Sequence, residues 1–339
     1  MDREAKPVPS LCQVYQDHFL IGAAVNARTI LTHESLLTQH FSSITAENEM
    51  KFEELHPALD RYDFQRADAL VNFAEQHGMK VRGHTLVWHN QTPSFVFSHS
   101  DGTARTREQV LAILREHMTT VMGRYKGRVY AWDVVNEAVS DADDRELRDT
   151  PWLRQVGEDY LSLAFEMAHE IDPNAQLFYN DYNETHPGKR ERIYRMVKSL
   201  LSRGVPIHGI GLQGHYRLGQ PPRDEIRDAI ERYASLGVKL QVTELDVSTY
   251  AWNDQSREVQ VQVQDARSQE RQAQRYEELF SLFRAYKDVL TGVTLWGIAD
   301  DATWLDNFPV RGRKDWPLLF TEDHVPKPAF WVVVDEATR

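Results

Sequence analysis

The chain contains the stretch Tyr130-Ala131-Trp132-Asp133-Val134-Val135-Asn136-Glu137-Ala138, an apolar run that ends in an amide beside a carboxylate. A buried strand rarely ends this way, because unpaired buried polar groups are costly. Polar residues that close an apolar strand are typical of a (β/α)₈ TIM barrel, whose strands open onto the active site. Residues 239–247, Lys-Leu-Gln-Val-Thr-Glu-Leu-Asp-Val, repeat the pattern. We therefore expect a parallel barrel with Glu137 and Glu244 at its mouth.

The rest of the chain alternates short apolar runs with helical patterns. Strands are predicted at 19–25, 41–46, 80–88, 130–138, 175–180, 209–216, 240–247 and 292–299. Helices are predicted at 66–77, 106–125, 151–171, 189–203, 224–236 and through 279–286. Eight strands that alternate with helices indicate one barrel, and we expect residues 1–339 to form a single domain. The Gln- and Arg-rich segment 256–273 is predicted to be a loop insertion that leads into a helix.

Composition excludes several classes of protein. The formal charge of −12 argues against nucleic acid and anionic membranes as partners, since both require clustered Lys and Arg. Cys12 is the only cysteine, so an intrachain disulfide is impossible. The N-terminal residues lack the basic and apolar regions of a secretory signal, and no apolar run approaches a membrane span. These features predict a cytoplasmic protein, although a secreted chain without its leader would look similar.

Strand alternation predicts which side chains face the barrel interior. Leu240, Val242, Glu244 and Asp246 share one side of their strand, and we expect that side to face inward. By the same rule Gln213 and His215 share a face. Polar and aromatic groups therefore gather at one end of most strands, which indicates a functional site.

Each carboxylate also has a purely structural interpretation. Glu137 or Glu244 alone could start a helix or belong to a salt bridge, but a pair at two inward-facing strand ends favours catalysis. His84 and His89 could be metal ligands, but no Cys or Asp follows at ligand spacing. We therefore predict no metal and no cofactor.

The aromatic and charged residues around these strands are open to similar alternatives. Trp88, Trp296 and Trp304 could belong to the core, but their places at strand ends favour a binding cleft. Glu47, Asn48 and Lys51 could equally form a solvated helix start.

Five motifs carry a resemblance to a known family. They are Thr-Ala-Glu-Asn-Glu-Met-Lys at 45–51, His-Thr-Leu-Val-Trp-His at 84–89, Trp-Asp-Val-Val-Asn-Glu-Ala at 132–138, Gln-Gly-His at 213–215 and Thr-Glu-Leu-Asp at 243–246. Together they resemble glycoside hydrolase family 10, from about Asp17 to about Trp331. The run Thr-Trp-Leu-Asp-Asn-Phe-Pro at 303–309 resembles the intracellular xylanases of that family, which act on imported oligosaccharides.

The resemblance implies a retaining endo-1,4-β-xylanase that hydrolyses xylan and xylo-oligosaccharides. Glu137 matches the general acid/base and Glu244 the nucleophile, and such carboxyl groups lie about 5–5.5 Å apart. Asp246 and His215 would hold Glu244 ionised and oriented. Asn136 matches the residue that binds the sugar 2-hydroxyl.

The resemblance also implies the sugar contacts. The glycone-side contacts would be Glu47, Asn48, Lys51, His84, Trp88 and Gln213. Trp296 and Trp304 would form aromatic walls that oppose the hydroxymethyl group of glucose, and Tyr182 would be an aglycone-side contact. The family also implies a cis peptide between His84 and Thr85.

Two other functions remain possible at this level. One is a carbohydrate-binding barrel without activity, although such a relic would be expected to have lost Glu137 or Glu244. The other is a β-glucosidase or cellulase on a similar barrel, which Trp296, Trp304 and the His84 motif disfavour. Preferred chain length, tolerance of branches, endo or exo action and oligomeric state are not predicted.

Overall fold

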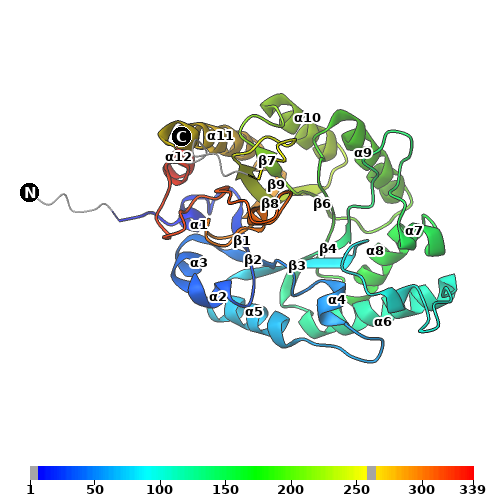
Figure 1. The fold of residues 1–339 in the computed structure, drawn as a ribbon. Helices are drawn as coiled ribbons and strands as arrows, with labels where there is room; N and C mark the ends of the chain where they lie inside the picture. Colours follow the sequence, from blue (N-terminus) through cyan, green and yellow to red (C-terminus); the bar gives the residue numbers. More distant parts are fainter. Residues whose placement is uncertain (1–6, 258–264) are drawn as a thin grey trace, which may run out of the picture.

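The computed structural model describes residues 7–257 and 265–339, and its centre is a closed parallel barrel (Figure 1). The strands are β1 Leu20–Val25, β2 Ser43–Ala46, β3 Lys80–Val87, β4 Val129–Asn136, β5 Gln176–Asp181, β6 Gly209–Leu212, β7 His215–Arg217, β8 Lys239–Ser248 and β9 Leu290–Leu295. They follow the order β6-β5-β4-β3-β2-β1-β9-β8-β7, and pairing of β6 with β8 closes the ring. The segments β6 and β7 both pair with β8 and act as one barrel strand. The predicted (β/α)₈ fold is confirmed.

Helices surround the strands in Figure 1. Their bounds are α1 Leu11–Val14, α2 Thr29–Thr32, α3 Glu34–His40, α4 Phe52–Leu55, α5 Gln65–Gln76, α6 Arg107–Tyr125, α7 Pro151–Val156, α8 Tyr160–Ile171, α9 Pro187–Ser202, α10 Arg223–Ala234, α11 Ala266–Ala285 and α12 Pro328–Glu336. Thr106 and Gln109 form a capping box that fixes the start of α6. None of the helices in the described residues is long and apolar enough to cross a membrane.

Three predicted elements differ from the structure. The predicted helix 151–171 is two helices, because Gly157 adopts φ 95° and ends α7. The predicted strand 209–216 is broken at Gly214, whose φ is 78°. Both conformations are ones that glycine adopts readily. Segment 256–273 is only partly a loop, since α11 begins at Ala266, while residues 258–264 lie outside the described part of the chain.

The barrel interior contains a buried polar network. The Arg82 guanidinium on β3 forms a bidentate pair with Asp133 on β4, and its Nε donates to Gln241 Oε1 on β8 at 3.0 Å. Strands β3 and β8 are not neighbours, so Gln241 points inward and Leu240 and Val242 point outward. The prediction that Leu240 and Val242 face the interior was therefore wrong.

Irregularities in the strands bring the catalytic candidates to the mouth. The register between β8 and β9 shifts between Val242 and Leu245, so Thr243 and Glu244 both reach the interior side. The register between β4 and β5 shifts in the same way between Asp133 and Val135. Such bulges re-aim side chains, and here they turn Asn136 and Glu244 toward the same space.

Candidate active site

A cleft of about 480 Å³ opens at the carboxyl ends of the strands. Its lining includes Lys51, His84, Trp88, His89, Asn136, Glu137, Arg148, Tyr182, Gln213, His215, Arg217, Glu244, Trp252, Trp296, Trp304 and Phe308. A second cavity of about 420 Å³ adjoins it and shares Asn183, His215, Arg217 and Trp252. The two predicted glutamates therefore lie in one elongated, polar and aromatic depression.

Glu137 lies immediately after β4 in a left-handed conformation, with φ 58°. Its carboxylate accepts hydrogen bonds from Trp88 Nε1 at 2.9 Å and from Gln213 Nε2 at 3.0 Å. The residue is only 9% exposed. Burial, with a smaller contribution from the charge of Asp181, raises the pKa of Glu137. This carboxyl group is therefore poised to carry a proton.

Glu244 lies in a different electrostatic environment. Its Oε2 lies 3.1 Å from His215 Nε2, and its Oε1 accepts from Asn180 Nδ2 at 2.9 Å. Burial alone would raise its pKa, but the His215 hydrogen bond and the charge of His84 outweigh burial, so the pKa of Glu244 is lowered. Glu244 is therefore ionised when Glu137 is protonated.

His215 is held between two carboxylates. Its Nδ1 lies 2.8 Å from Asp246 Oδ2, and that carboxylate also accepts from Trp304 Nε1 at 2.8 Å. Burial opposes a positive charge, but Asp246 and Glu244 outweigh it and raise the pKa of His215 to about 10. The imidazole is therefore a cation that donates from both nitrogens at neutral pH.

Two asparagine amides belong to the same hydrogen-bond network as Glu244. The side-chain amides of Asn136 and Asn180 lie 3.0 Å apart, and Thr243 Oγ1 donates to Asn180 Oδ1 at 2.6 Å. Asn180 is fully buried on β5 and is thereby locked in place. Asn180 contacts both Asn136 and Glu244, and Gln213 contacts both Asn136 and Glu137, so Asn136 is linked to each carboxylate through one amide.

Residues that follow β2 approach the cleft to different degrees. Lys51 lines it, with Nζ 2.9 Å from Asn48 Oδ1 and 4.9 Å from the centre of the Trp88 ring. Burial lowers the pKa of Lys51, against the opposing charges of nearby glutamates. Glu47 accepts from Asn26 Nδ2 at 3.1 Å. Glu47 and Asn48 are partly exposed but are not among the described residues that line the cleft, and Asp246 contacts the cleft through His215.

His84 forms part of the cleft floor. Its Nδ1 lies 2.9 Å from Asp133 Oδ2, and the peptide bond between His84 and Thr85 is cis, which confirms that expectation. Its ring meets Trp296 edge to face, with centroids 5.5 Å apart. Trp304 stacks on Phe308 at 4.9 Å, so the aromatic wall continues past the strand ends.

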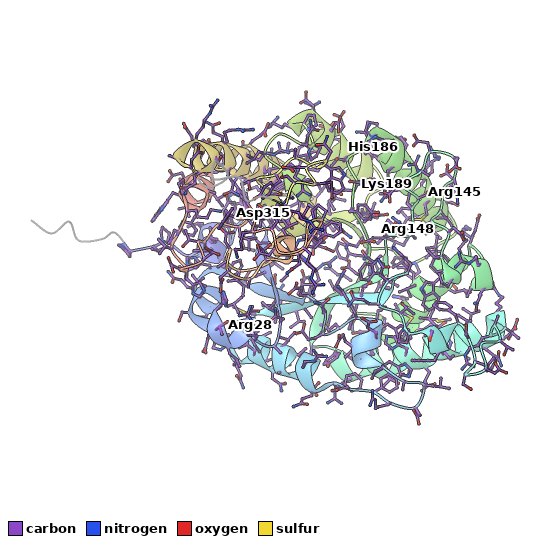
Figure 2. The ribbon with its side chains drawn as sticks, viewed as in Figure 1. Arg28, Arg145, Arg148, His186, Lys189 and Asp315 are labelled. Carbon is purple, nitrogen blue, oxygen red and sulfur yellow. The ribbon has the colours of Figure 1, made fainter. Side chains whose placement is uncertain are left out.

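Tyr182 lies at the other end of the cleft. Its hydroxyl donates to Asp141 and accepts from Arg148 Nη2 at 2.8 Å, while Lys189 Nζ lies 3.8 Å from the ring centre. Figure 2 shows Arg148 and Lys189 on this side of the molecule, near α9.

Burial and the charge of Arg148 lower the pKa of His89 to about 4, so this cleft histidine is neutral.

Comparison with known proteins gives the family. Residues 10–336 match glycosyl hydrolase family 10. An endo-1,4-β-xylanase B from Paenibacillus barcinonensis and an endo-1,4-β-xylanase from Geobacillus stearothermophilus are each 54% identical to the chain over 329 residues, covering 97% of this chain and 98% of theirs. The chain belongs to glycosyl hydrolase family 10.

Solved structures of family 10 members have the same fold. A xylanase from Paenibacillus barcinonensis, crystallised with a conduramine derivative, superposes with a TM-score of 0.95 at 54% identity, covering 97% of this chain and 99% of the other. A Thermobacillus composti family 10 xylanase superposes with a TM-score of 0.86 at 51% identity, covering 96% and 99% of the two chains.

Sequence reasoning missed several side chains of this family 10 site. Asn180 was not singled out, although an amide after the apolar run Leu177-Phe178-Tyr179 was a usable signal. Asp133 was missed in the same way, as a lone acid within an apolar strand. Trp252 and Phe308 lie in loops. Phe308 belongs to the run at 303–309, from which only Trp304 was assigned to the cleft, and nothing in the local sequence places Trp252 there.

Proposed function

We propose that Glu137 and Glu244 perform the retaining hydrolysis of β-1,4-xylosidic bonds by double displacement, with Glu137 as general acid/base and Glu244 as nucleophile. The observation that carries this proposal is that two buried carboxyl groups share one cleft while their pKa values are shifted in opposite directions. A raised pKa suits proton donation, whereas a lowered pKa suits nucleophilic attack.

In the first step Glu137 protonates the glycosidic oxygen while a Glu244 oxygen attacks the anomeric carbon. The bond to the leaving sugar breaks and a covalent glycosyl-enzyme forms. Glu137, now ionised, then removes a proton from water, and the water oxygen displaces Glu244. Both displacements invert the anomeric centre, so the product retains its β configuration.

Hydrogen bonds to Glu244 serve both displacements. The His215 cation and the Asn180 amide bind one oxygen each, at 3.1 and 2.9 Å, which favours the carboxylate as leaving group in the second step. Asp246 keeps His215 charged. Asn136, beside Asn180, is the proposed partner of the sugar 2-hydroxyl, an interaction that strengthens in the transition state.

The remaining predicted cleft side chains, together with Glu47 and Asn48 outside the lining, are assigned to sugar binding. Lys51, Asn48, Glu47, His84, Trp88 and Gln213 are the proposed glycone side, Trp296 and Trp304 the aromatic walls, and Tyr182 the aglycone side. Indoles next to the cleaved sugar would oppose an exocyclic hydroxymethyl group, because overpacking is costly. Aryl xylosides should therefore be cleaved faster than aryl glucosides, and the reverse order would favour a β-glucosidase.

We assign residues 1–339 to one catalytic domain that acts on xylo-oligosaccharides in the cytoplasm. Tyr15 Oη donates to the Val333 carbonyl at 2.7 Å, which joins the two ends of the described chain to one core. The proposed location is supported by the resemblance of residues 303–309 to intracellular xylanases and by the single cysteine, since cytoplasmic proteins rarely need disulfides. Cell fractionation tests the location.

Azide rescue of two variants tests the catalytic assignment. Glu244→Ala should lower kcat by several orders of magnitude, and azide should restore turnover of an activated aryl xyloside with formation of the inverted α-xylosyl azide. Glu137→Ala should form the β-xylosyl azide, because azide then attacks the glycosyl-enzyme. Near-normal rates in both variants, or the opposite azide anomers, would show that the pair is misassigned.

A further inference from the structure

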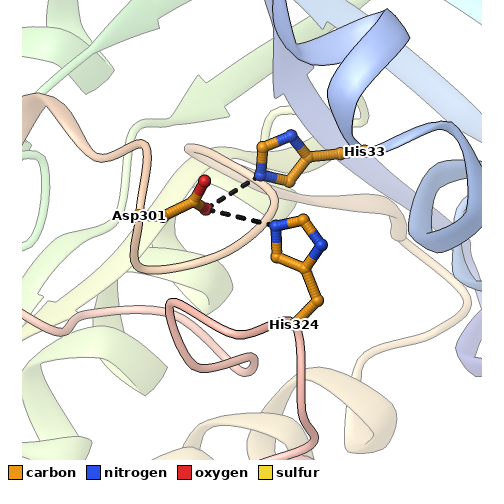
Figure 3. Close-up of side chains that lie close together, drawn as sticks. All are labelled: His33, Asp301 and His324. Atoms are coloured by element: carbon orange, nitrogen blue, oxygen red, sulfur yellow. Dashed lines mark hydrogen bonds and ion pairs between the residues drawn. The ribbon is translucent and has the colours of Figure 1, made fainter.

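Outside the cleft, three side chains from distant parts of the chain meet at one point. His33 follows α2, Asp301 lies in the loop after β9, and His324 lies in the loop before α12 (Figure 3). His33 Nε2 lies 2.8 Å and His324 Nε2 lies 3.6 Å from the same oxygen, Asp301 Oδ1. All three potential ligand atoms lie within 4.8 Å of one another.

We propose that His33, Asp301 and His324 bind a divalent transition-metal ion, with Zn²⁺ as the best match. Two imidazoles and a carboxylate are a donor set that zinc prefers, whereas Ca²⁺ and Mg²⁺ require oxygen ligands. In a tetrahedral zinc site the ligand atoms lie roughly 3.4 Å apart. The two histidine–carboxylate distances, 2.8 and 3.6 Å, bracket that value, and all three ligand atoms lie within 4.8 Å of one another.

Hydrogen bonding of His33 supports the required tautomer. Its Nδ1 lies 2.7 Å from Thr32 Oγ1, and this hydroxyl donates to the Arg28 carbonyl at 3.3 Å. When the hydroxyl proton is directed at the Arg28 carbonyl, Oγ1 can accept from Nδ1–H. That arrangement leaves the Nε2 lone pair free for a metal, in the way that outer hydrogen bonds orient histidine ligands.

The third side chain separates a metal site from a simple hydrogen bond. A hydrogen bond between His33 and Asp301 needs no third group, yet His324 also lies beside Asp301. The backbone of His324 is left-handed, with φ 63°. The tight turn that presents it is held by hydrogen bonds from His324 N to Thr321 O at 3.0 Å and from Val325 N to Thr321 Oγ1 at 3.1 Å. Non-glycine residues in this conformation often serve a function.

Exposure of the three groups suits binding from solution. The His33 side chain is fully buried, while those of Asp301 and His324 are 29% and 34% exposed. The buried imidazole would fix the ion, and the exposed pair leaves room for a water ligand. Since β1 pairs with β9, the ion would tie together loops that follow the first and last barrel strands.

A binding experiment on the full chain tests the site. Protein treated with EDTA and dialysed is titrated with ZnCl₂ by calorimetry, and we expect one equivalent to bind. His324→Asn, which keeps a residue that tolerates the left-handed backbone, should weaken binding at least tenfold, and Asp301→Asn should do the same. Thr32→Val, which removes only the hydroxyl, should weaken it by about 10- to 100-fold.

A matched control comes from His77, which is 30% exposed and lies 3.7 Å from Glu34, with no third potential ligand close to them in the described part of the chain. His77→Asn should bind Zn²⁺ like the unchanged protein. Zn²⁺ should also raise the Tm of the unchanged protein and of His77→Asn, but not that of His324→Asn. Absence of binding at millimolar Zn²⁺, or equal binding by His324→Asn, would overturn the proposal.

Discussion

At the scale of single residues, Glu137 and Glu244 are both buried, but their hydrogen-bond partners differ. Neutral donors, Trp88 and Gln213, face Glu137, whereas a cationic donor, His215, faces Glu244. Burial pushes both pKa values upward, and only at Glu244 does a charge overcome it. In the proposed mechanism, His215 is therefore the residue that favours Glu244 over Glu137 as the nucleophile.

The first prediction follows from this role of His215. In the unchanged protein, the acid limb of kcat/KM should report Glu244 below the ordinary carboxyl pKa, and the alkaline limb should report Glu137 above it. In His215→Asn burial of Glu244 is less opposed, so the acid limb should move to higher pH while the alkaline limb moves less. A pH–rate profile with an activated aryl xyloside measures this. An unmoved acid limb would contradict the assignment.

The second prediction concerns stability at the same two positions. Because the folded-state pKa of Glu137 is raised, its ionised form costs stability above that pKa and costs nothing below the ordinary value of 4.5. Glu137→Gln should therefore raise Tm by roughly 1–3 °C at pH 8 and have no effect near pH 4.

Glu244 provides the matched comparison. Its folded-state pKa is lowered, so it stabilises the fold above the ordinary value of 4.5, and this contribution is lost as the pH falls through the lowered value. Glu244→Gln should therefore lower Tm at pH 7. Thermal melts of both variants from pH 4 to 8 decide the matter, and shifts of the same sign would contradict the proposed electrostatics.

At the scale of elements, the helix and strand alternation was predictable, but its interruptions were not. Period-two reasoning placed Leu240 and Val242 on the inner face together with Glu244, whereas a register shift after Val242 separates them. Such a shift depends on the pairing with the neighbouring strand β9, so it cannot be predicted from the local hydrophobic pattern. Glu244 was thus predicted on the correct face of β8, whereas Leu240 and Val242 were assigned to the wrong face.

The third prediction concerns the break between α7 and α8. Gly157 has φ 95°, and an added Cβ would lie 3.3 Å from Asp159 Oδ1, so Gly157→Ala should destabilise the fold by about 1–3 kcal/mol. Gly123 lies within α6, where an added Cβ meets nothing within 4 Å, so Gly123→Ala should stabilise by about 0.5–1 kcal/mol. Urea unfolding measures both. A stabilising Gly157→Ala would show that one continuous helix is accessible.

At the scale of the whole molecule, what escaped prediction is contact between positions far apart in the chain. Arg82 and Gln241 are 159 positions apart and meet inside the barrel, and His33 and Asp301 are 268 positions apart and meet outside it. Motifs show which residues follow each strand, but only barrel closure determines which of them touch. The polar ends of two apolar strands predicted the pairing of Glu137 with Glu244, and the family resemblance added their roles, whereas nothing in the sequence pointed to the cluster at His33.

The last prediction joins the whole cleft to the size of the substrate. If imported oligosaccharides are the substrates, glycone-side contacts should make kcat/KM rise steeply from xylobiose to about xylotetraose and then level off, because remote sugars contribute binding energy to the transition state. Lys51→Met should reduce this rise more than it slows an activated aryl xyloside, since Lys51 lies beside Trp88 in the cleft lining. Tyr182→Phe, at the opposite end, serves as the control and should leave the glycone-side rise intact. Rates measured on purified oligosaccharides give the answer, and a rate that keeps rising on polymeric xylan would contradict the proposed cytoplasmic role.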